Sequence, residues 1–152
     1  MQERNANSLA ARFQAEHDEL MQVQAEVGRA YRQFRDAPST ETQTHLEGVL
    51  SEFGSHLTEH FSAEEEDGML QLDGGLQPAD AREVVRLRSE HGEMRTEMAH
   101  LSTDLGRRLG DPGEAAVIGE TIHHLFHRLH DHEAAENRLM MDTYWDDSGP
   151  AD

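Results

Sequence analysis

The hydrophobic positions of this chain recur at helical spacing in four blocks and do not alternate, over any useful length, as they would in a β-strand. The first block runs from about Asn5 to Arg35, and the others begin at Thr40, Pro78 and Pro112. Their apolar positions are, block by block, Leu9, Phe13, Leu20, Val27, Tyr31 and Phe34; Leu46, Val49, Leu50, Phe53 and Leu57; Val84, Leu87, Met94, Met98, Leu101 and Leu105; and Ile118, Ile122, Leu125, Leu129 and Leu139. Long amphipathic helices joined by short loops predict an all-α fold, an antiparallel up-down-up-down four-helix bundle.

The segments between the blocks carry residues that stop and start helices. Thr40 with Gln43 has the spacing of a capping box, and Pro78 and Pro112 are suited to the first turn of a helix. The second helix is expected to fray near Gly68, before a loop that contains two consecutive glycines. We therefore predict one domain over residues 1–145 and a disordered tail over residues 146–152.

The composition excludes several classes of protein. The chain of 152 residues has no Cys, so disulfides and thiolate metal sites are ruled out, and its 13 basic residues are all Arg. A net charge of −18 argues against nucleic acid or an anionic membrane as a partner. It would favour attraction of cations, but a solvated acidic surface is the simpler explanation of the charge. No apolar run reaches membrane-spanning length and the N-terminus is not a signal peptide, which predicts a cytoplasmic protein.

One pattern of histidine and glutamate occurs twice. A Glu-His pair in the first and third blocks is followed, at nearly the same distance, by a His-x-x-x-Glu motif in the second and fourth. The residues concerned are His17, His60 and Glu64 in the first half and His91, His132 and Glu136 in the second. A His and a Glu four residues apart share one face of a helix, so each half can supply two imidazoles and one carboxylate.

On a helical wheel, both His-x-x-x-Glu motifs lie within the apolar stripe of their helix. Burying a carboxylate costs several kcal/mol unless something compensates its charge, and metal cations are the natural compensation. A purely structural polar core is the simpler alternative. Imidazole and carboxylate ligands without sulfur suit iron, manganese or zinc, and four His with two Glu suffice for two ions.

This series of motifs resembles the hemerythrin-like family, also called HHE cation-binding domains, over residues 5–142. The resemblance implies that His17, His60, His91 and His132 are iron ligands and that Glu64 and Glu136 bridge two iron ions, with or without an oxo group. Zinc or manganese could replace the iron.

The chain departs from the oxygen-carrying members of that family. They have a His-x-x-x-His pair in the third helix, whereas the positions four away from His91 are Leu87 and Arg95. Their second bridging carboxylate is an Asp five residues after the last His, whereas Glu136 follows His132 by four. The chain is similar instead to a bacterial four-His, two-Glu variant, which is associated with peroxide, nitric oxide or iron handling.

Three functions therefore remain open. The first is a non-haem di-iron protein that reacts with oxygen species, above all peroxide, in a catalase-like reaction. The second is a non-catalytic sensor or reservoir of iron, oxygen or nitric oxide, and the third is a bundle stapled by zinc. We expect small molecules as partners and no nucleic acid or membrane.

The remaining histidines fall mostly outside the stripes. His123, His127 and His130 are expected on the solvent face of the fourth helix, where they could hold a surface ion or simply be solvated. His56 precedes His60 by four residues at the stripe edge, which makes it a candidate for an extra ligand or a hydrogen-bond donor.

Overall fold

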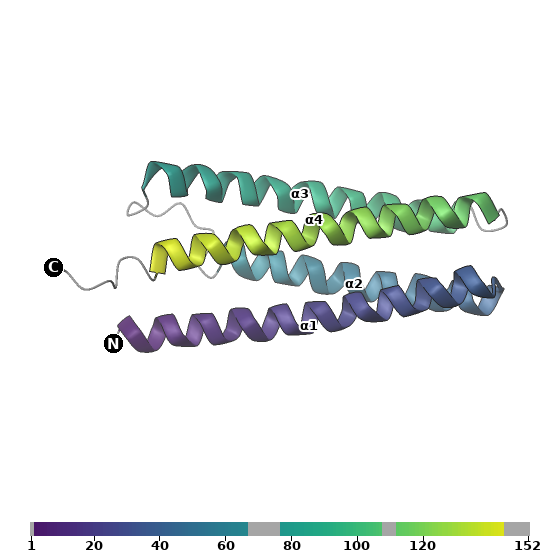
Figure 1. Ribbon diagram of the computed structural model, residues 1–152, viewed down its shortest axis with the longest axis horizontal. Coiled ribbons are helices and arrows are strands. Elements are labelled where there is room, and N and C mark those ends of the chain that lie inside the picture. Colours follow the sequence, from purple (N-terminus) through teal and green to yellow (C-terminus); the bar gives the residue numbers. More distant parts are fainter. Residues whose placement is uncertain (1, 67–76, 108–111, 145–152) are drawn as a thin grey trace.

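The computed structural model describes residues 2–66, 77–107 and 112–144, apart from the side chains of residues 2–10, 13, 107, 112, 143 and 144, and its helices are four (Figure 1). The helices are α1 (Gln2–Asp36), α2 (Thr40–Glu66), α3 (Pro78–Arg107) and α4 (Pro112–Tyr144). Each helix packs against the next in sequence, and α1 also packs against α4. The start of α1 and the end of α4 lie at the same end of the molecule. The predicted up-down-up-down bundle is therefore confirmed. The glycine loop and the tail after residue 145 lie outside the described residues.

The cap of α2 is one residue earlier than predicted. Ser39 and Thr42 form the reciprocal pair: the backbone N–H of Thr42 donates to Ser39 Oγ, and the backbone N–H of Ser39 donates to Thr42 Oγ1, both at 3.0 Å. Gln43 bonds to Glu47 instead. The capping box predicted from Thr40 and Gln43 was wrong because Thr40 already has helical geometry, so the preceding serine satisfies the free N–H groups.

The core is divided into two unequal apolar clusters. The larger one receives side chains from all four helices, among them Phe34, Phe53, Leu105 and Ile118. Among the side chains that the structure describes, the smaller one contains Val84, Leu87, Ala135 and Leu139, from α3 and α4. The apolar positions predicted for α2, α3 and α4 are all buried, while Tyr31 is only partly buried and the side chains of Leu9 and Phe13 are not described.

Tyr31 links α1 to α4 near the end of the bundle that holds the larger cluster. Its hydroxyl donates a hydrogen bond to the carbonyl oxygen of Ala115 at 3.0 Å. The phenol lies directly against Gly119, where an added Cβ atom would stand 2.0 Å from the Tyr31 oxygen. Glycine at this position is therefore required by the close approach of the ring.

Candidate metal centre

A layer of buried polar residues separates the two apolar clusters. The layer comprises His60 and Glu64 from α2, His91 from α3, and His132, Glu133 and Glu136 from α4. None of these six residues is more than 6% exposed. Charged groups are rarely buried to this degree without a compensating partner.

Within this layer the potential ligand atoms form two overlapping groups, each with all its atoms within 4.8 Å of one another. The Glu133 group consists of His60, Glu64, Glu133 and Glu136. The His91 group consists of Glu64, His91, His132 and Glu136. Glu64 and Glu136 belong to both groups, so the layer offers two adjacent binding positions with two carboxylates in common.

The imidazole nitrogens face these carboxylates directly. His60 Nε2 lies 2.6 Å from Glu64 Oε1 and 2.8 Å from Glu133 Oε1. His91 Nε2 lies 3.1 Å from Glu64 Oε2 and 3.2 Å from Glu136 Oε1, and His132 Nε2 contacts the same Glu136 oxygen. The two oxygens of Glu64 thus face different histidines, whereas His91 and His132 approach the same oxygen of Glu136.

The opposite ring nitrogen of each buried histidine faces a carboxylate outside the layer. Glu65 lies 3.1 Å from His91 Nδ1, close enough to accept a hydrogen bond. Glu16 lies 3.7 Å from His60 Nδ1, and Glu90 lies 3.8 Å from His132 Nδ1. Outer carboxylates of this kind orient metal-bound imidazoles and increase their basicity. In both halves of the repeat, the Glu of the Glu-His pair therefore lies beside the histidine of the following His-x-x-x-Glu motif: Glu16 beside His60, and Glu90 beside His132.

Several buried polar atoms of the layer have no hydrogen-bond partner among the described residues. Among them are Nδ1 of His60, Nδ1 of His132 and Oε2 of Glu136. Leaving such groups unsatisfied costs about 1–3 kcal/mol each, and more when they are charged. The donor set fits metal ions, because coordination would use the lone pairs that hydrogen bonds leave free.

The proximity of these groups changes their pKa values. Burial lowers the pKa of His60, but hydrogen bonds to Glu133 and Glu64 outweigh it and raise that pKa to about 10. Burial raises the pKa of Glu64, but its bonds to His60 and His91 lower it to about 2. Without metal, these shifts favour the protonated form of His60 and the ionised form of Glu64.

The pKa values of Glu136 and His132 are shifted in the directions opposite to those of Glu64 and His60. Burial, reinforced by the charge of Glu64, raises the pKa of Glu136 well above its ordinary value. Burial, together with the charge of His91, lowers the pKa of His132 to about 4. These shifts favour the protonated form of Glu136 and the neutral form of His132.

His17 lies at the rim of the cluster rather than inside it. Its side chain is 32% exposed, and His17 Nδ1 lies 3.0 Å from Glu133 Oε2. His91, its counterpart in the repeat, is fully buried. Of the predicted ligands, the structure thus brings together His60, Glu64, His91, His132 and Glu136, while His17 reaches the cluster through Glu133.

Sequence reasoning missed Glu133. This residue is the second buried carboxylate of α4 and the one that joins His17 to His60. The spacing of residues along the fourth helix could have predicted that Glu133 is buried. Glu133 follows the core residue Leu129 by four positions and therefore continues the apolar stripe.

The other singled-out histidines lie outside the two groups. His123, His127 and His130 are exposed, as predicted, and His127 Nε2 lies 3.9 Å from Asp131. His56 lines a cavity between α1 and α2, with Glu19 4.0 Å and Glu52 3.9 Å from its ring nitrogens.

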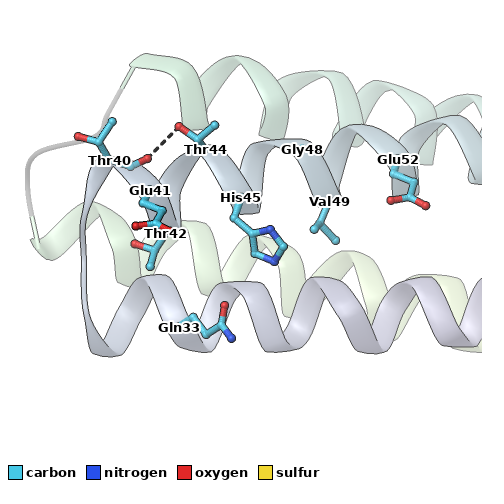
Figure 2. Close-up of a pocket in the computed structure, with 9 residues that line it drawn as sticks. All are labelled: Gln33, Thr40, Glu41, Thr42, Thr44, His45, Gly48, Val49 and Glu52. Atoms are coloured by element: carbon cyan, nitrogen blue, oxygen red, sulfur yellow. Dashed lines mark hydrogen bonds between the residues drawn. The ribbon is translucent and has the colours of Figure 1, made fainter.

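A cavity of about 1040 Å³ lies near the turn between α1 and α2 (Figure 2). Its lining comes from Gln33 of α1 and from residues of α2 that include His45 and Glu52. No residue of the Glu133 or His91 group lines it. His45 precedes His60 on α2 by a distance of roughly 22 Å at the rise of an α-helix. This cavity is therefore separate from the candidate metal centre.

No helix among the described residues is long and apolar enough to cross a membrane. No protein-family model, curated protein or solved structure matches this chain. The bundle and its buried His/Glu cluster, which could hold metal ions, are thus established by the structure alone.

Proposed function

We propose that the protein binds two iron ions in the buried cluster and reacts with oxygen species, above all hydrogen peroxide. The observation that carries the proposal is that the Glu133 and His91 groups share Glu64 and Glu136. Two adjacent binding positions with common carboxylates are typical of di-iron sites in helical bundles. The donor set would also suit manganese or zinc. The resemblance of the repeated motif to hemerythrin-like proteins favours iron.

The balance of ligands favours oxidation over reversible oxygen binding. The cluster contains three buried carboxylates, because Glu133 adds to Glu64 and Glu136. Anionic oxygen ligands stabilise the ferric state of iron more than neutral imidazoles do. When bound, the iron pair would supply electron exchange with peroxide. Around it, Glu65 holds the ring of His91 in place, and the stacked Phe61 keeps water from that ring.

An optical spectrum and elemental analysis of protein purified from iron-supplemented cells provide the first test. We expect about two iron ions per chain, since the cluster offers two positions. The control is the triple variant His123→Gln/His127→Gln/His130→Gln, which removes the exposed histidines of α4 and should keep the spectrum and the iron content. Loss of iron from that variant would contradict the buried location.

Stopped-flow mixing tests the reaction itself. The reduced protein should oxidise irreversibly in air, and the oxidised protein should consume hydrogen peroxide at a measurable rate. Reversible oxygen binding would contradict the proposal and favour a carrier or sensor. An oxidised protein that is inert to peroxide would favour an iron-binding module without turnover, and zinc as the only bound metal would favour a structural role.

A further inference from the structure

A second cavity, of about 230 Å³, lies between α1 and α2 beside the candidate metal centre. Its polar lining consists of Glu16 and Glu19 from α1 and His56, Glu59 and His60 from α2. No Arg is among its lining residues in the described part of the chain. The cavity therefore presents three carboxylates and two imidazoles.

The lining residues become less exposed toward the cluster. The side chain of Glu19 is 63% exposed and that of Glu16 is 37% exposed, whereas that of His60 is 4% exposed. His56, 30% exposed, stands between Glu19 and Glu52 with its ring nitrogens about 4 Å from both carboxylates. The cavity thus leads from solvent to a buried histidine.

His60 forms the common wall between this cavity and the metal centre. Its Nε2 atom faces Glu64 and Glu133 in the cluster, and its Nδ1 atom lies 3.7 Å from Glu16, which lines the cavity. Nδ1 is buried and has no hydrogen-bond partner among the described residues. The inner end of the acidic cavity therefore reaches a histidine of the Glu133 group, which makes the cavity an approach to the cluster from outside.

We propose that this cavity is the entry route for divalent cations and a transient binding site on their way to the cluster, with His56, Glu19 and Glu16 as ligands. This inference rests on the proposed metal centre, because the cavity would deliver ions to that centre. Carboxylates and imidazole match the ligand preferences of Fe²⁺, Mn²⁺ and Zn²⁺. A cleft lined by charge of one sign concentrates oppositely charged ions and accelerates their association.

The test measures the rate at which metal-free protein takes up Co²⁺, followed by the visible absorption of the ion. The variant Glu19→Gln/His56→Gln/Glu59→Gln removes charge and ligands from the cavity but leaves both cluster groups intact. We expect uptake to slow by about tenfold at low salt, with a smaller difference at high salt. The final number of ions per chain should equal that of the unmodified protein.

The matched control is Glu41→Gln/Asp104→Asn/Glu120→Gln, which replaces three exposed acids near the other end of the bundle. It should take up Co²⁺ as fast as the unmodified protein. The charge-neutral variant Ala63→Leu adds bulk to a residue that lines the cavity and should also slow uptake.

Equal uptake rates in the cavity variant and its control would overturn the entry route while leaving the metal centre standing. No Co²⁺ binding by the unmodified protein would overturn the metal centre and the route together. Unchanged uptake combined with slower peroxide consumption by the loaded cavity variant would also overturn the proposal, because the cavity would then admit the substrate and not the metal.

Discussion

Phe61 lies flat against His91, with the ring centroids 3.9 Å apart and the ring planes 12° from parallel. In the internal repeat, Phe61 corresponds to Glu133, since each directly follows the histidine of a His-x-x-x-Glu motif. Glu133 accordingly lies against His17, the counterpart of His91, at 3.0 Å. One half of the cluster therefore has an aromatic ring where the other has a carboxylate, so the two candidate metal positions are chemically unequal.

Replacing Glu133 should affect one metal position and spare the other. The variant Glu133→Gln removes a charged ligand from the Glu133 group only. We expect the metal content after dialysis to fall from about two ions per chain toward one, because the His91 group keeps its four ligands. Elemental analysis of the dialysed protein measures this.

The companion variant Glu64→Gln should lose both ions, because Glu64 belongs to both groups. Equal metal losses in Glu133→Gln and Glu64→Gln would show that the two positions are not distinguished by Glu133.

Removing the metal should lower the melting temperature. Ions that bind only the folded state stabilise it by about 4 kcal/mol when their free concentration is a thousand times Kd. The double variant His60→Ala/Glu64→Ala should have little metal, and its melting temperature should not respond to a chelator. Calorimetry with and without chelator makes the comparison. If that variant keeps both its metal content and its melting temperature, the cluster is not the metal centre.

Metal binding should release protons and strengthen as pH rises. His60, with a pKa of about 10, carries a proton at neutral pH in the metal-free protein, and burial with the charge of Glu64 keeps Glu136 protonated in preference to Glu64. Both groups must lose their protons to coordinate a cation, so the apparent affinity increases with pH. Titration calorimetry in buffers of different ionisation enthalpy counts the released protons, and a heat independent of the buffer would contradict this prediction.

Adding a methyl group should have opposite effects at two glycines. At Gly119 a Cβ atom would lie 2.0 Å from Tyr31 Oη, so Gly119→Ala should destabilise the fold by about 1–3 kcal/mol through overpacking. At Gly48 the added atom has nothing within 4 Å, so Gly48→Ala should stabilise the protein by roughly 0.5–1 kcal/mol through helix propensity. Urea denaturation of both variants measures the difference, and equal stabilities would contradict the close packing of Tyr31.

Periodicity was sufficient to predict the bundle, because four long stripes of apolar residues leave few other arrangements. It also brought His60, Glu64, His132 and Glu136 to one core, since residues four apart share a helix face. It did not single out Glu133, which is one of 31 acidic residues and is recognisable only by the core residues that precede it. The partial exposure of His17 depends on the distance between α1 and α4. A helical wheel describes a single helix, so it could not predict this exposure.

The polar layer that divides the core has a consequence for how the ions are exchanged. The larger apolar cluster joins all four helices, so it should hold the bundle together when the layer carries no metal. Under the proposed function, metal ions would then enter or leave through the cavity between α1 and α2 while the protein stays folded, and the metal content would follow the supply of ions without unfolding of the chain.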